Sequence, residues 1–246
     1  NILNVANAVI ANNTARNAKK LWTDAGDGEK ITIYKASDEA SESNFVATTI
    51  LNGVKDGGKY KDYAVLYRMN AQSNSLERAF TSSGIPYRVI GGQRFYDRKE
   101  IRDIVAYLSV LNNDRDMLRF KRIINEPKRG IGDTTVSMIE QMSSDLGISP
   151  IEVMKNSESY PLLSKKTAQL VKTADMFIEL KNIAETKPLD EMLDILLDKT
   201  GYAAYMKSLG DEGIARMENI NELKSTMVEY MNGKAEGEEY SLSEFL

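Results

Sequence analysis

One short stretch of the sequence gathers a cation, two amides and a hydroxyl, at Arg68, Asn70, Gln72 and Ser73. These residues follow an alternating apolar run typical of a β-strand and precede a helical pattern at residues 73–82. In an open α/β sheet, ligands bind at the carboxyl ends of the strands, where helix N-termini also point. The cluster is therefore a candidate ligand site. One alternative stays open, in which Asn70 and Ser73 cap the helix and Arg68 is a solvated charge.

A second polar stretch contains two glycines, Gly130 and Gly132, which permit a tight turn and a close approach of another backbone. The next helix is expected to begin near Thr134, so its first N–H groups lie beside the hydroxyl of that residue. With the flanking cations Lys128 and Arg129, the stretch suits a phosphate of a nucleic-acid backbone. An ordinary connection between two helices, with an N-cap, is the alternative that these residues leave open.

Residues 91–101 mix aromatic residues with cations and admit two interpretations. They could meet nucleic acid by stacking and charge. They could also form a hinge between domains, in which Phe95 packs inward and Arg98 and Arg102 pair with acidic neighbours. The hinge is the favoured interpretation.

The stretch from Gly53 to Tyr60 nearly matches the phosphate-loop pattern G-x-x-x-x-G-K-[ST]. It departs from that pattern in two ways. Tyr60 replaces the Ser or Thr that would bind Mg²⁺, and the stretch follows a helix and precedes a strand, which is the reverse of a phosphate loop. It is therefore predicted to be a turn, and no other stretch resembles a site for a nucleoside triphosphate.

The composition excludes several classes of chemistry. The chain of 246 residues has no Cys and no His, so disulfides, thiolate or imidazole metal sites and Ser-His-Asp or Cys-His catalysis are ruled out. No apolar run approaches the roughly 18 residues of a membrane span. The net charge of −4 is unevenly distributed: residues 85–135 hold 11 Lys/Arg against 7 Asp/Glu, whereas residues 208–246 hold 3 against 9. A local phosphate-binding face is therefore compatible with an acidic chain, although the charges could equally be scattered over helix surfaces.

The elements that would position the two polar stretches fall into two groups. Strands are expected at residues 31–36, 63–67 and 87–90, and the helices between them imply a small, incomplete parallel sheet. Beyond residue 91 only helical periodicity remains, at residues 99–111, 117–125, 134–146, 164–185, 189–199 and 217–232. The predicted fold is an α/β part, residues 1–90, followed by an all-α part, residues 91–246. Because the chain starts without Met inside a helical pattern, it is interpreted as a fragment of a longer polypeptide.

Together, these stretches resemble the UvrD/PcrA/Rep family of ATP-dependent DNA helicases, most closely its PcrA branch. Residues 64–73 (AVLYRMNAQS) resemble helicase motif IV, and residues 91–101 (GGQRFYDRKEI) resemble the segment that follows it. Residues 125–134 (NEPKRGIGDT) resemble the GIG element of the family, and residues 19–23 (KKLWT) also fit. The matches occur in family order and span nearly the whole chain.

The resemblance implies a DNA-binding fragment of an ATP-dependent 3′-to-5′ helicase that unwinds duplex DNA in repair and replication. Residues 1–90 would be the first part of the second RecA-like motor domain (2A), and residues 91–246 would be the helical insertion (2B). Arg68 and Asn70 would hold the translocating single strand. The duplex ahead of the fork would be held by Lys128, Gly130, Gly132 and Thr134.

The same resemblance implies cofactors and partners. The parent enzyme would use ATP and Mg²⁺, but the family's residues for them have no matching positions here, so the fragment alone is predicted to bind neither and to be inactive. Its partner would be DNA, as single strand and as duplex junction, in the cytoplasm and away from the membrane. Repair proteins or RNA polymerase are further candidate partners. The alternative function is a helical module that docks such proteins without touching DNA.

Overall fold

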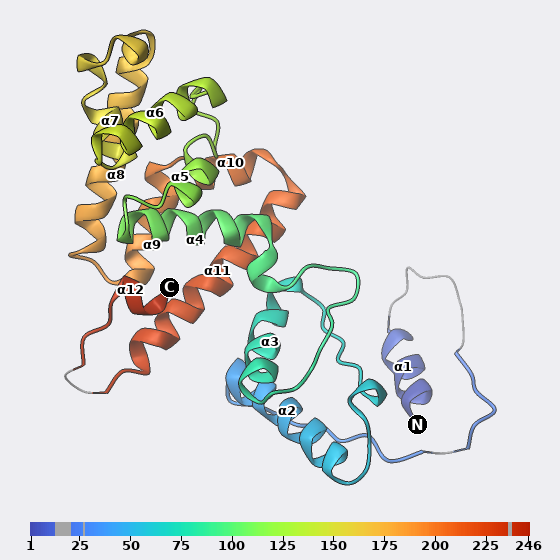
Figure 1. Cartoon of the computed structure of the whole chain (residues 1–246). Helices are drawn as coiled ribbons and strands as arrows, with labels where there is room; N and C mark the ends of the chain where they lie inside the picture. Colours follow the sequence, from blue (N-terminus) through green and yellow to red (C-terminus); the bar gives the residue numbers. More distant parts are fainter. Residues whose placement is uncertain (13–20, 27, 236–237) are drawn as a thin grey trace.

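The computed structural model of the chain describes residues 1–12, 21–26, 28–235 and 238–246, which fold into helices and connecting loops (Figure 1). Lys19 and Lys20, which contribute to the family resemblance, lie outside the described residues. The α-helices are α1 (Ile2–Ile10), α2 (Glu39–Lys55), α3 (Ser73–Ser82), α4 (Lys99–Asn112), α5 (Met117–Ile123), α6 (Asp133–Leu146), α7 (Pro150–Lys155), α8 (Thr167–Ala184), α9 (Leu189–Lys199), α10 (Tyr202–Ser208), α11 (Asp211–Asn232) and α12 (Leu242–Phe245).

The predicted parallel sheet is wrong, because the described part of the chain contains no strand. The segments at residues 31–36, 63–67 and 87–90 leave apolar side chains in solvent, with Ile33 91%, Leu66 95% and Ile90 89% exposed. Alternating apolar residues favour an extended backbone, but a strand forms only when a neighbouring segment pairs with its N–H and C=O groups. Among the described residues no segment supplies that pairing. The α/β class predicted for residues 1–90 is therefore corrected to helices and loops.

Within residues 1–90, α2 and α3 pack against each other around a small hydrophobic cluster. The side chain of Asp38 begins α2 by accepting a hydrogen bond from the N–H of Ser41 at 2.7 Å, as an N-cap does. The cluster consists of Ala47, Ile50, Ala79, Phe80 and Ile85. By contrast, α1 buries none of its residues.

The larger hydrophobic core lies among α4 to α11, and its buried members run from Phe95 to Met227 along the chain. Three fully buried aromatic side chains stand near its centre, with the rings of Tyr107 and Phe177 6.0 Å apart and those of Phe120 and Phe177 6.4 Å apart. Burying one such side chain stabilises a fold by roughly 1.5–3 kcal/mol. This core is the platform on which the loop between α5 and α6 rests.

Helix α3 lies near α11 (Figure 1), and polar side chains join the two helices. The buried amide of Asn74 donates hydrogen bonds to Glu222 and Thr226, both at 3.0 Å. On α3 the carboxylate of Glu77 accepts hydrogen bonds from Ser73 at 2.8 Å and from the N–H of Phe95 at 3.2 Å. Because the Asn74 donors and the Glu77 carboxylate are paired inside the fold, the junction fixes how α3 meets the larger core.

Candidate nucleic-acid interface

The first candidate site is a turn of residues 68–72, called here the first turn, which leads directly into α3. The side-chain oxygen of Gln72 accepts hydrogen bonds from the N–H groups of Arg68 at 3.1 Å and Met69 at 3.0 Å. This closes the turn and fixes the backbone at Arg68. The side chains of Arg68 and Asn70 lie exposed, so both are free to meet a ligand in solvent.

The capping alternative for this turn does not match the geometry. The residue before α3 is Gln72, whose side chain turns back along the chain, and no side-chain cap is formed there in the described structure. Ser73 is buried and donates its hydroxyl proton to Glu77. Within the described residues, the amide of Asn70 and the guanidinium of Arg68 have no hydrogen-bond or ion-pair partner.

Arg98 supports the first turn from inside the molecule. One Nη donates hydrogen bonds to the carbonyl of Asn70 at 3.0 Å and to the hydroxyl of Ser73 at 2.7 Å, and the other donates to Asn219 on α11 at 2.8 Å. The predicted inward packing of Phe95, which is 0% exposed, is confirmed. The predicted pairing of Arg98 with acidic neighbours is wrong, because amide, carbonyl and hydroxyl oxygens surround it instead. A buried cation needs such acceptors in place of water.

The second candidate site is residues 126–134, called here the second turn, which comprise most of the loop after α5 and the first two residues of α6. Its predicted members all lie exposed on the surface: Lys128, Gly130, Gly132 and Thr134. Between the two glycines, Ile131 is 0% exposed and anchors the loop in the core. Gly130 has φ +69°, a left-handed conformation that strains residues with a side chain.

The backbone of the second turn is open to a ligand where α6 begins. A Cβ placed on Gly132 would meet no described atom within 4 Å. Gly132 is also the N-cap of α6, and in the described structure no side chain caps this end. The first N–H groups of an uncapped helix remain available to an anion, and the helix dipole favours negative charge there.

Arg129 departs from its predicted role. It was interpreted as a cation flanking a phosphate, but its guanidinium points into the molecule. It donates to the carbonyl of Ile123 at 2.9 Å, to the carbonyl of Thr200 at 3.0 Å and to the hydroxyl of Tyr107 at 2.6 Å. A direct phosphate contact through these N–H groups would break this set of bonds.

The structure adds Lys166, which sequence reasoning missed. Its ammonium donates to the carbonyl of Gly130 at 3.2 Å and lies exposed beside the second turn. Lys165 and Lys166 form a visible basic pair in the sequence, but nothing local connects that pair with a loop 36 positions away. The second turn is therefore contacted by a cation on its outer side.

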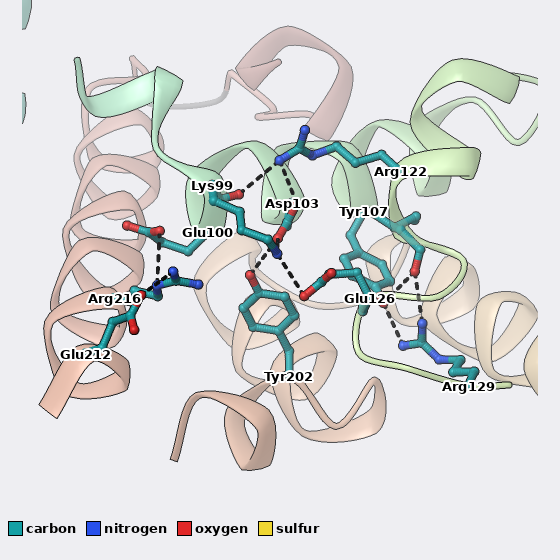
Figure 2. Close-up of polar contacts among 11 residues, drawn as sticks. Lys99, Glu100, Asp103, Tyr107, Arg122, Glu126, Arg129, Tyr202, Glu212 and Arg216 are labelled. Carbon is teal, nitrogen blue, oxygen red and sulfur yellow. Dashed lines mark hydrogen bonds and ion pairs between the residues drawn. The ribbon is translucent and has the colours of Figure 1, made fainter. Parts of the chain in front are cut away.

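Behind the second turn lies an ion network centred on one buried carboxylate, shown in Figure 2. Asp103 on α4 is 1% exposed and pairs with Lys99 and Arg122, each at 2.8 Å, while Tyr202 donates to it at 3.0 Å. Lys99 also pairs with Glu126, the first residue of the second turn, at 2.8 Å. Two cations and a phenol thus compensate one buried carboxylate, and the Lys99–Glu126 pair ties the turn to α4.

Neither a cluster of metal-ligating residues nor a membrane-spanning helix is found in the described ranges. They hold no group of three or more Asp or Glu residues placed to bind a metal ion. None of their helices combines the length and the apolar character needed to cross a bilayer.

Comparison with known proteins places the whole chain in one family. Residues 1–246 match the model of the UvrD-like helicase C-terminal domain. The ATP-dependent DNA helicase PcrA of Staphylococcus aureus is 39% identical over 246 residues, covering 100% of this chain and 34% of the relative. The protein of the same name from Leuconostoc citreum is 38% identical over 234 residues, covering 94% of this chain and 31% of the relative. The chain therefore spans about a third of the length of the curated relatives it matches.

Proposed function

This chain belongs to the family of UvrD-like helicase C-terminal domains, and from that premise we propose that it is a DNA-binding part of an ATP-dependent DNA helicase. The observation that carries the proposal is the presence of two exposed polar turns in a chain that the family model matches over its full length. Strand separation, 3′-to-5′ translocation and ATP hydrolysis would belong to the complete polypeptide, acting in the cytoplasm.

In this proposal, the first turn contacts single-stranded DNA through Arg68 and Asn70. The second turn contacts the backbone of duplex DNA through the ammonium of Lys128, the hydroxyl of Thr134 and the open backbone at Gly130 and Gly132. Phosphate contacts of this kind position DNA without reading its sequence. A helicase that works on any sequence requires contacts with that property.

We further propose a boundary near residue 90 between a motor-domain part and a helical part. Its support is the separation of the two hydrophobic clusters, because the smaller ends at Ile85 and the larger begins at Phe95. The first turn lies before this boundary and the second turn after it. Single-strand and duplex contacts would then belong to different units, joined through α3, α4 and α11.

ATP and Mg²⁺ are implied for the complete enzyme, but Gly53 to Tyr60 do not fit a phosphate site. In a phosphate loop the glycines precede a helix N-terminus, whereas here α2 ends at Lys55 and the loop folds back on it. The N–H of Gly58 donates to the carbonyl of Gly53 at 2.9 Å, which closes the loop on itself. The nucleotide would therefore be bound by other residues of the complete polypeptide.

Salt-dependent binding tests the proposal. The complete natural polypeptide that contains these residues is titrated onto a labelled duplex–single-strand junction at several salt concentrations. Binding through several phosphates lowers log K by about 0.9 per phosphate for each log unit of salt on duplex DNA. Tight junction binding with a steep salt slope is expected. Absence of junction binding would contradict the proposal and favour a module that docks proteins.

A further inference from the structure

Arg129 joins three separate elements behind the second turn. Its guanidinium donates to carbonyls at the end of α5, those of Ile123 at 2.9 Å and Ile124 at 3.2 Å, and to the carbonyl of Thr200 after α9 at 3.0 Å. It also donates to the hydroxyl of Tyr107 on α4 at 2.6 Å. An arginine presents five N–H donors in a rigid planar fork, so these acceptors fix its orientation closely.

Tyr107 contacts the second turn at two points. Its hydroxyl accepts from Arg129 and donates to the carbonyl of Glu126 at 2.7 Å (Figure 2). Burial raises the pKa of Tyr107 to about 12, so the hydroxyl keeps its proton at any ordinary pH. The two residues it contacts flank Lys128 on either side in the chain. Tyr107 itself is 0% exposed and cannot touch DNA.

We propose that Tyr107 and Arg129 are positioning residues for duplex binding, which hold the second turn in the shape that presents Lys128 and Thr134 to the DNA backbone. This inference rests on the proposed function of the second turn. Arg129 thus acts by holding the shape of the loop, whereas its neighbour Lys128 makes the contact with the DNA backbone. A positioning residue of this kind has no effect once the contacts it positions are gone.

Tyr107→Phe is the main test, and Tyr202→Phe is its matched control. Both tyrosines are 0% exposed in the same core, and each change removes one buried hydroxyl. The hydroxyl of Tyr202 donates to Asp103, and in the described residues it forms no hydrogen bond with the second turn. Each variant is made in the complete natural polypeptide. Affinities are measured for a duplex–single-strand junction and for single-stranded DNA.

The expected result is a selective loss in one variant. Tyr107→Phe weakens junction affinity about fivefold, the size of effect typical for one lost hydrogen bond, and leaves single-strand affinity unchanged. Tyr202→Phe changes both affinities by less than about twofold, because its hydrogen bond does not reach the turn. Arg129→Lys keeps the positive charge but cannot reach acceptors on three elements, so it reproduces the junction defect.

A double-mutant cycle separates positioning from mere stability. In a background of Lys128→Ala with Thr134→Ala, Tyr107→Phe is expected to cause no further loss of junction affinity, because the contacts it positions are absent. Equal losses from Tyr107→Phe and Tyr202→Phe, or a full Tyr107→Phe effect in that background, would overturn the positioning role. If the Lys128 and Thr134 changes themselves leave junction affinity intact, the proposed duplex contact is wrong instead.

Discussion

The two turns expose similar side chains but are held in different ways. The first turn is closed mainly from within, by Gln72 bonding to backbone groups three and four positions earlier. The second turn is held by residues distant in sequence, because Arg129 contacts Tyr107 and Thr200, 22 and 71 positions away. The shape of the first turn is set mainly by its own hydrogen bonds, whereas the shape of the second turn is set by contacts with the helical core.

Because the two turns are held by different residues, a mutation is expected to disturb one turn and leave the other intact. A change deep in the helical core should reach the second turn through α4 and leave the local closure of the first turn intact. Conversely, a change at Gln72 should disturb only the first turn. Single-strand and duplex binding are therefore expected to respond to different mutations, and the following variants test that separation in the complete natural polypeptide.

The largest effect is expected from Asp103→Ala. Removing this carboxylate, whose side chain is 2% exposed, leaves Lys99 and Arg122 without their shared acceptor. The change leaves the buried hydroxyl of Tyr202 without its acceptor and removes one ion-pair partner of each cation, which lowers the free energy of unfolding by about 2 kcal/mol. Urea denaturation measures the loss, and junction affinity should fall with it while single-strand affinity persists.

The control is Asp114→Ala, whose pair with Lys181 is more exposed and contributes about 0.5 kcal/mol. Equal destabilisation by the two variants would contradict the importance given to the ion network around Asp103.

Lys128→Ala combined with Thr134→Ala should weaken junction binding about thirtyfold, since one charged and one neutral hydrogen bond to phosphate are lost. The loss should be the same for any DNA sequence, and the salt slope should fall by about 0.9 for the one cation removed. Fluorescence anisotropy with two junctions of unrelated sequence measures both quantities. Lys121→Ala, an exposed cation of α5 paired with Glu140, serves as the control. Unchanged junction affinity in the double variant would remove the duplex contact.

Arg68→Ala should reduce single-strand affinity about tenfold, near the lower end of the loss typical of one charge-assisted hydrogen bond. ATP hydrolysis stimulated by single-stranded DNA should fall in parallel at low DNA concentration, whereas junction binding through the second turn should persist. Lys61→Ala, another exposed cation of the same part, is the comparison. Normal single-strand binding together with normal ATPase activity would show that the assigned role of Arg68 is wrong.

The smallest effect is expected from Gln72→Ala. Without its side-chain oxygen the turn at Arg68 and Met69 loses two local hydrogen bonds, and single-strand affinity should fall about threefold. The free energy of unfolding should barely change, since Gln72 is exposed. A matching loss of junction affinity would mean that the two turns are not independent.

Helices were predictable where their apolar spacing is long and regular. The predicted ranges for α3 and α9 coincide with the observed bounds, Ser73–Ser82 and Leu189–Lys199. The short helices α7 and α10 were missed, because so few residues show little periodicity, although Ser149 and Pro150 form a typical helix start. The predicted strands failed for another reason. Alternation describes one segment, whereas a sheet depends on a second segment that pairs with it.

The candidate sites show the same contrast between local features, which the sequence predicts, and distant contacts, which it does not. Their positions follow from local residue types, since glycines, hydroxyls and cations between helical patterns mark exposed turns. Side-chain directions do not follow from local sequence. Lys128 and Arg129 are adjacent cations, yet one is exposed and the other is turned inward by partners on α4 and beyond α9. Only the folded arrangement of the core separates the cation available for contact from the one that shapes the loop.

The inward cation has one more consequence, which concerns the speed of encounter with DNA. Arg129 is bonded to carbonyls and a phenol, and within the described residues no carboxylate forms an ion pair with it. The positive charge of Arg129 is therefore held close behind the surface of the second turn. It adds to the positive electrostatic potential that attracts approaching DNA. Such a fixed charge accelerates association, most strongly at low ionic strength, where the screening length exceeds about 10 Å. A residue that DNA never touches would thus help to guide DNA to the turn.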